Sequence, residues 1–281
     1  MAEYDLTVTQ SQAFREHLHQ EERSAGTIEK YMRDVNAFSL WLEDRPVTKT
    51  RAAEWKEHLL ACGYNPVTVN SMVAAINAFF AFAGWTDCRV KALRIQRRMF
   101  RSEERELTRS EYDRLLQTAQ GLGRVRLALL METICGTGIR VSEVPYVTVE
   151  AAQRGRTDIS LKGKIRTILL PGKLCRKLIK YAKKQKIASG EIFRTRSGGS
   201  LGRKQIWSEM KALCIRAGVK PSKVFPHNLR HLFARAFYQA SHDVAKLADV
   251  LGHSSIETTR IYLIATGAEH AVQLERLGLI S

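Results

Sequence analysis

The sequence lacks several features that would place it in common protein classes. No hydrophobic run approaches the roughly 18 apolar residues that a membrane span needs, and the start of the chain lacks the basic and then apolar layout of a signal peptide. The five cysteines are scattered, and no two form a C-x-x-C pair. We therefore expect a cytoplasmic protein without a disulfide framework, a metal site, a cofactor or contact with a membrane.

Acidic residues are scarce beyond the first third of the chain. The 281 residues include 45 Lys and Arg against 28 Asp and Glu, a formal net charge of +17. Residues 1–100 hold 13 basic and 12 acidic residues, so nearly all of the excess lies beyond them. Such an excess indicates a polyanionic partner, most simply nucleic acid bound through its phosphates. The alternatives are an anionic membrane surface and a charge that only aids solubility.

Hydrophobic periodicity predicts a first, helical domain over residues 1–85. Residues 8–22, 26–42, 50–61 and 65–82 each predict a helix, and Pro66 suits the first turn of the fourth. Residues 86–106 predict a linker, because periodicity is poor there. It contains the run Arg94, Arg97, Arg98 and Arg101, which meets no acidic residue until Glu103. Such a run is either a solvated surface or a basic strap across a nucleic-acid backbone.

The second predicted domain, residues 107–281, begins with a helix. Thr108 and Glu111 have the spacing of a capping box, in which side chains satisfy the first free amides of a helix. Further on, the glycines of GTGIRVSE end one helix and place Arg140 at the start of a turn. Pro145 then shortens the next helix, since it removes one backbone hydrogen bond.

Residues 158–170 alternate in hydrophobicity as a β-hairpin does. Ile159 and Leu161 share one side of the first predicted strand, and Ile165, Thr167 and Leu169 share one side of the return strand. The tip reads KGK at residues 162–164, where glycine can take a positive φ.

Residues 226–262, PHNLRHLFARAFYQASHDVAKLADVLGHSSIETTRIY, carry the densest pattern of the chain. His227 and Arg230 are three residues apart, so on a helix they share a face and can hold one phosphate together. Apolar residues then recur at helical spacing up to Gly252, which offers a helix stop. The S-x-x-E spacing that begins at Ser254 predicts another helix, which carries the final tyrosine.

Four motifs together resemble the tyrosine recombinase (integrase) family: GTGIRVSE, H-x-L-R-H, L-G-H-S and a T-x-x-Y that ends at Tyr262. The resemblance implies a mainly α protein with a small β-sheet, in which a helical core-binding domain and a catalytic domain form a clamp on DNA. It also implies a catalytic set that acts on one phosphodiester. The set is Arg140, Lys162, His227, Arg230, His253 and Tyr262.

The resemblance assigns a role to each of these residues. Tyr262 would attack the scissile phosphate and form a 3′-phosphotyrosine, while Arg140 and Arg230 stabilise the charge on its oxygens. His253 would bind the same phosphate, and His227 would move a proton at the tyrosine.

A lysine on the hairpin would protonate the leaving 5′ oxygen. Lys162 precedes a glycine, as in the family pattern G-K-G-x-K, but this hairpin looks one residue shorter, so Lys164 stays an alternative. Glu143 lies one turn from Arg140 and is expected to orient it.

Residues 203–216 predict a helix whose apolar side includes Ile206, Trp207 and Met210. By the resemblance, this helix lies in the major groove, where Arg and Gln side chains can read base edges. With the linker arginines, the residues expected to contact DNA are Arg203, Lys204, Gln205 and Lys211. Residues 268–280 predict a final short helix, which packs either on another protomer or on its own domain.

The resemblance implies an enzyme that cuts and rejoins duplex DNA at specific sites without metal or ATP. We expect a tetramer on paired half-sites, a monomer or weak oligomer when free, and a nucleoid-associated role on mobile-element or prophage DNA. Chromosome-dimer resolution and DNA inversion use the same chemistry. Two other classes stay open: a type IB topoisomerase, which relaxes supercoils alone, and a DNA-binding regulator with a silent active site.

Overall fold

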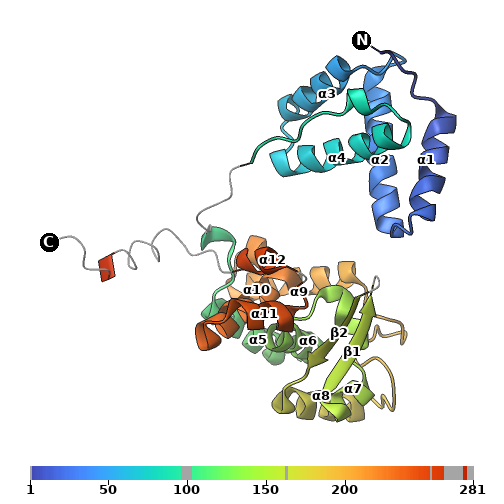
Figure 1. Ribbon diagram of the computed structural model, residues 1–281. Coiled ribbons are helices and arrows are strands. Elements are labelled where there is room, and N and C mark those ends of the chain that lie inside the picture. Colours follow the sequence, from blue (N-terminus) through green and yellow to red (C-terminus); the bar gives the residue numbers. More distant parts are fainter. Residues whose placement is uncertain (1, 96–102, 162–163, 254, 263–274, 277–281) are drawn as a thin grey trace. The chain divides into compact units, whose positions relative to one another are not determined.

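The computed structural model describes residues 2–95, 103–161, 164–253, 255–262 and 275–276. The chain divides into two compact units, residues 1–97 and 98–281, and each encloses its own hydrophobic core. Helices dominate both units, and the described part of the chain holds one sheet, of two strands (Figure 1). The predicted mainly α fold with a small sheet is therefore confirmed. Among the described helices, none has the length and apolar character to cross a bilayer.

Unit 1 is a bundle of four helices. They are α1 (Val8–Gln20), α2 (Ala25–Leu42), α3 (Lys49–Ala61) and α4 (Pro66–Phe82), and a 3₁₀ turn, η1 (Thr86–Cys88), follows them. The side chain of Asn65 caps α4 by accepting from the amide of Val67 at 3.0 Å, and Pro66 takes the first helical position, where no amide is needed. Buried rings such as Phe38 and Trp55 fill the centre. All four helices agree with those that periodicity predicts.

Unit 2 is built around helix α6 (Val125–Thr137). This helix packs against α5 (Arg109–Gly121), α8 (Gly172–Lys184), α9 (Arg203–Ala217) and α10 (Pro226–Ser241). Eight of its 13 residues are buried because these partners pack around it. The other helical elements are η2 (Glu103–Arg105), η3 (Val141–Tyr146), α7 (Val149–Arg154), η4 (Pro221–Lys223), α11 (Val244–Leu251) and α12 (Ile256–Arg260).

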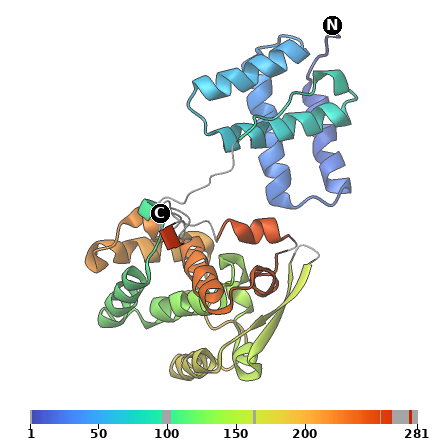
Figure 2. The same ribbon diagram turned by 60° about the vertical axis from the view of Figure 1, so that its left-hand side comes forward.

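The two strands form an antiparallel hairpin at the side of unit 2 away from α5 (Figure 2). They are β1 (Arg156–Leu161) and β2 (Lys164–Leu169). Leu161 pairs with Lys164, so residues 162–163 join the strands and Lys164 belongs to β2 rather than to the tip.

The buried face of β2 is not the side that carries Ile165 and Leu169. Ile159 and Ile168 are buried, whereas Ile165 and Leu169 are 79% and 71% exposed. The two sides of a strand alternate residue by residue, so the side that holds Ile168 faces the core and the side that holds Ile165 faces outward. The short connection places Arg166 opposite Ile159, and Arg166 consequently shares the buried face with Ile168.

Helix α9 corrects one predicted core position. Ile206, Met210 and Leu213 are buried, but Trp207 is 50% exposed. The ammonium of Lys211 lies 5.1 Å from the centroid of the Trp207 ring. The three buried residues follow i, i+4, i+7 spacing, which leaves Trp207 at the margin of the apolar face.

Helix α12 begins one residue later than predicted. Ser255 rather than Ser254 caps it, and the Ser255 hydroxyl accepts from the amide of Glu257 at 3.2 Å. Ser254 lies outside the described residues, as does most of the predicted helix over residues 268–280. The capping box predicted at Thr108 is present.

The observed strand parity makes a direct prediction about stability. Ile168→Ala removes buried methyl and methylene groups and should lower the free energy of unfolding by about 2–4 kcal/mol. Ile165→Ala alters an exposed side chain and should change it by less than about 0.5 kcal/mol. Urea denaturation of the two variants and the wild type measures both values. A larger loss for Ile165→Ala would contradict the register.

Candidate active site

The members of the implied catalytic set come from separate segments of unit 2. Arg140 precedes η3, Arg230 lies on α10, His253 follows the end of α11, and Tyr262 follows α12. The structure brings them together. Arg230 Nη2 lies 2.9 Å from His253 Nε2, and the rings of His253 and Tyr262 stack with centroids 5.6 Å apart.

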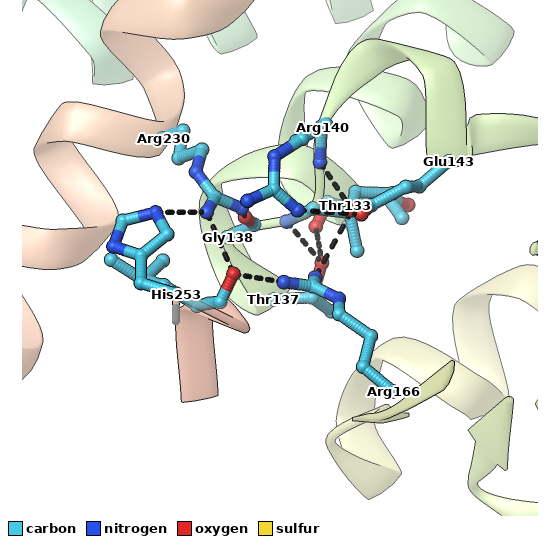
Figure 3. A network of polar contacts seen from close by, with 10 residues as sticks. Thr133, Thr137, Gly138, Arg140, Glu143, Arg166, Arg230 and His253 are labelled. Atoms are coloured by element: carbon cyan, nitrogen blue, oxygen red, sulfur yellow. Dashed lines mark hydrogen bonds and ion pairs between the residues drawn. The ribbon is translucent and has the colours of Figure 1, made fainter. Parts of the chain in front are cut away.

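Arg230 is deeply buried, with 2% of its surface exposed. Its guanidinium donates to the carbonyl oxygens of Gly138 and Leu251 as well as contacting His253 (Figure 3). Gly138 ends α6 with a φ of +66°, and a Cβ at that position would lie 2.4 Å from Phe233. Glycine is therefore needed where α6 ends against α10, and its carbonyl becomes a partner for the buried charge.

Arg140 is held by Glu143, as expected from their spacing. The Arg140 amide donates to Glu143 Oε2 at 2.7 Å, and Arg140 Nη1 donates to Oε1 at 2.9 Å. The Glu143 side chain is 3% exposed, whereas that of Arg140 is 42% exposed. The carboxylate is thus enclosed, while the guanidinium that it holds stays accessible to a ligand. Pro145 lies inside the short turn η3, which agrees with the predicted shortening of this helix.

A further guanidinium, which no motif identifies, completes the cluster. Arg166 on β2 donates to Glu143 Oε2 at 3.0 Å and to the carbonyl of Leu251 (Figure 3). Burial lowers the pKa of Arg166 to about 10, although the charge of Glu143 offsets part of this effect. Arg166 is therefore protonated at neutral pH. The one sequence signal for Arg166 is its spacing of two residues from Ile168. That spacing places both side chains on the same face of the strand, which the structure shows to be the buried one.

His253 is neutral in this arrangement. Its Nε2 faces the guanidinium of Arg230, which can only donate, so Nε2 accepts and Nδ1 carries the proton. Nδ1 in turn donates to Thr259 Oγ1 at 2.8 Å. Burial lowers the pKa of His253 to about 4, and the surrounding arginine charges add to the shift. Thr259, which is fully buried, was not predicted to belong to the site.

Tyr262 is 4% exposed and lies among histidine rings. Its ring centroid is 4.4 Å from that of His231 and 5.7 Å from that of His227. The pKa of Arg230 is lowered by its burial, an effect that its interaction with Tyr262 only partly offsets. Desolvation and arginine charges lower the pKa of His227, which favours a neutral imidazole that can accept a proton. His231 lies outside the implied catalytic set, yet its ring lies beside that of the tyrosine.

The residues predicted to contact DNA have different surroundings. Arg203, Lys204 and Gln205 are exposed at the start of α9. The charge of Arg203 contributes to the lowered pKa of His227, so the start of α9 is electrostatically coupled to the site. Lys211 donates to the carbonyl of Pro221 and is thus engaged within its own unit.

Other predicted residues lie outside the described residues: Lys162, Arg97, Arg98 and Arg101. Arg94 precedes that gap, and Lys164 opens β2. Across the described ranges, no three His, Cys, Asp or Glu side chains gather as a metal site would require.

Two family models match the chain. Residues 105–268 match the phage integrase family, and residues 12–87 match the phage integrase N-terminal SAM-like domain. The first match alone spans more than half of the sequence. The chain belongs to the phage integrase family.

Curated relatives of this integrase-family chain include tyrosine recombinases named XerA. That of Pyrococcus furiosus is 28% identical, with 100% of this chain and 98% of the relative covered, and that of Thermococcus kodakarensis is 30% identical, with 92% and 90% covered. Among solved structures, the Tn1549 transposon integrase in complex with transposon right-end DNA shares the fold. Its TM-score is 0.69 at 17% identity, with 96% of this chain and 99% of that chain covered.

The neutral, half-buried His253 predicts a loss of stability in acid. Its pKa of about 4 lies below the ordinary 6.5, so between these values the unfolded chain binds more protons than the folded chain. Stability should therefore fall as the pH drops from 6.5 toward 4. Calorimetric Tm values at several pH values should fall less steeply for His253→Gln than for the wild type. Parallel slopes would contradict the lowered pKa.

Proposed function

We propose that this chain is a site-specific recombinase that cuts and rejoins duplex DNA through a 3′-phosphotyrosine at Tyr262. One observation carries the proposal: the Tyr262 ring stacks on that of His253, and His253 Nε2 contacts Arg230 beside the accessible guanidinium of Arg140. A tyrosine beside two arginines and a histidine supplies a nucleophile and the donors that a phosphodiester needs. Membership of the phage integrase family and relatives named tyrosine recombinases support the same reaction.

The proposed reaction exchanges one phosphorus–oxygen bond for another. The Tyr262 oxygen bonds to phosphorus and the 5′ oxygen of the next nucleotide leaves, while Arg140 and Arg230 stabilise the pentacoordinate transition state. His227 accepts the phenol proton, and Lys162 donates a proton to the leaving oxygen. Rejoining is the reverse, with a 5′ hydroxyl as the nucleophile. The phosphotyrosine conserves the bond energy, so the cycle needs neither ATP nor metal.

Thr259 allows His253 to donate a hydrogen bond to the phosphate. A phosphate oxygen needs a donor, whereas His253 Nε2 accepts from Arg230 in the free protein. The Thr259 hydroxyl can either accept from Nδ1 or donate to it. We infer that a bound phosphate replaces the contact between Arg230 and His253. The proton of His253 then sits on Nε2, and both side chains donate to the phosphate.

Duplex DNA is the proposed partner of both units. The residues 1–85 form the proposed core-binding domain, residues 107–281 the catalytic domain, and residues 86–106 a basic connection across the backbone. Exposed Arg203 and Lys204 at the start of α9 are suited to base edges. Gln205 donates to Glu209 and Lys211 to the carbonyl of Pro221, so these two are weaker candidates. The related Tn1549 integrase was solved with DNA, which supports this partner.

The proposed biological role is integration or excision of a mobile element or prophage by a tetramer on paired half-sites. The free chain would be a monomer or weakly associated. Chromosome-dimer resolution and inversion proceed by the same chemistry, and the positions of the target sites distinguish these roles.

Covalent trapping tests the proposed reaction. The wild type and Tyr262→Phe are expressed in cells, the lysate is denatured, and the DNA that stays attached to the purified chain is sequenced. We expect adducts at one or a few recurrent sites with the wild type and none with Tyr262→Phe, because phenylalanine lacks the attacking oxygen.

Other outcomes would contradict the proposal in distinct ways. Adducts without sequence preference would indicate a topoisomerase. Salt-sensitive DNA binding without any adduct would indicate a regulator with a silent active site.

A further inference from the structure

Arg166 links the partners of the two arginines that are proposed to bind phosphate. Its Nη2 donates to Glu143 Oε2 at 3.0 Å, and Glu143 Oε1 accepts from Arg140 at 2.9 Å. Its Nη1 donates to the carbonyl of Leu251, which also accepts from Arg230 Nη2 at 2.8 Å. One guanidinium thus contacts the immediate partner of Arg140 and the immediate partner of Arg230 (Figure 3).

The surroundings of Arg166 are shaped to this side chain. A Cβ on Gly252 would lie 2.4 Å from Arg166 Cδ and 2.7 Å from its Nη1, so the turn after α11 leaves room for the arginine. The Arg166 side chain is 13% exposed, and two of its nitrogens are occupied by protein acceptors. A planar guanidinium donates to the two acceptors from two separate nitrogens, whereas all three donors of a lysine ammonium sit on one nitrogen. Arg166 is thus built into the protein rather than offered to DNA.

Charge explains why such a link is needed. Arg140, Arg166 and Arg230 surround one described carboxylate, Glu143, so the cluster keeps an excess of positive charge until an anion arrives. Like charges repel, and without fixed partners the exposed guanidinium of Arg140 would turn toward water. Contacts that fix Glu143 and the Leu251 carbonyl therefore also fix the distance between Arg140 and Arg230.

We propose that Arg166 is a positioning residue that holds Arg140 and Arg230 at the separation that the transition state of strand cleavage requires. This role rests on the proposed function. Because Arg166 acts through Glu143 and Leu251, its loss should slow cleavage and leave DNA affinity nearly unchanged. A displacement of a catalytic group by about 1 Å can cost about 100-fold in rate.

A charge-altered substrate tests this role. Suicide duplexes carry the site recovered by adduct sequencing, with either a phosphodiester or a neutral methylphosphonate at the scissile position. Replacing one oxygen by methyl removes the negative charge that the arginines stabilise, so the reaction depends less on their placement. Cleavage rates and DNA affinities are measured for the wild type, Arg166→Gln and Arg166→Lys. Arg156→Gln, an exposed arginine on the same hairpin, is the matched control.

We expect Arg166→Gln to cleave the phosphodiester about 100-fold more slowly than the wild type, with DNA affinity within about threefold. Its ratio of methylphosphonate to phosphodiester rates should rise at least tenfold over the wild type. The cleavage rate and the rate ratio of Arg166→Lys should lie between those of the wild type and Arg166→Gln. Those of Arg156→Gln should match the wild type. If Arg166→Gln does not fold, as judged by its Tm, the ratio of methylphosphonate to phosphodiester rates in Arg166→Lys tests the proposal instead.

An equal loss on both substrates would show that Arg166 is merely structural and would overturn the proposal, as would a wild-type rate in Arg166→Gln. Absence of any adduct from the wild type would instead overturn the proposed function, and this role of Arg166 with it.

Discussion

The carboxylate of Glu143, shared by two guanidinium groups, is the interaction on which the arrangement of the site depends. It accepts from the amide and side chain of Arg140 and from Arg166, and it is almost fully enclosed. A buried charge is tolerated only where its partners have good geometry, so the turn η3 and strand β2 are both fixed by the same acceptor. Without this carboxylate, two adjacent positive charges would face each other without compensation.

Backbone carbonyls play the same part for Arg230. Those of Gly138 and Leu251 accept from it, and both lie where a helix ends and leaves carbonyls without intrahelical partners. The glycine at 138 and the one at 252 take left-handed conformations there, and each approaches a side chain too closely for a Cβ. The ends of α6 and α11 thus provide neutral acceptors for a buried cation, and the positive potential of the cluster is preserved for a phosphate.

Local sequence signals were sufficient for the helices of unit 1 and for most of those of unit 2, because helical periodicity and capping depend on neighbours in the chain. The position of Arg166 could not be predicted in this way. Which face of β2 carries Arg166 depends on the length of the connection between the two strands. A change of one residue in that connection would turn the Arg166 face outward and the face of the now exposed Ile165 inward. The contact of Thr259 with His253 depends on how α12 packs. The exposure of Trp207 depends on which side of α9 is covered by other elements. These are tertiary effects. The roles of the catalytic residues stay predictions.

Tyr262 packs against His227, His231 and His253 of its own chain, so in the proposed reaction each protomer cleaves with its own tyrosine. Mixing Tyr262→Phe with Arg140→Gln, one of them enlarged by a tag, tests this most directly on a duplex that carries the trapped site. Neither variant holds a complete site, so the mixture should form no covalent adduct above that of either variant alone. An adduct on the Arg140→Gln chain at the wild-type rate would show that the tyrosine acts in a neighbouring protomer and would contradict a site assembled within one chain.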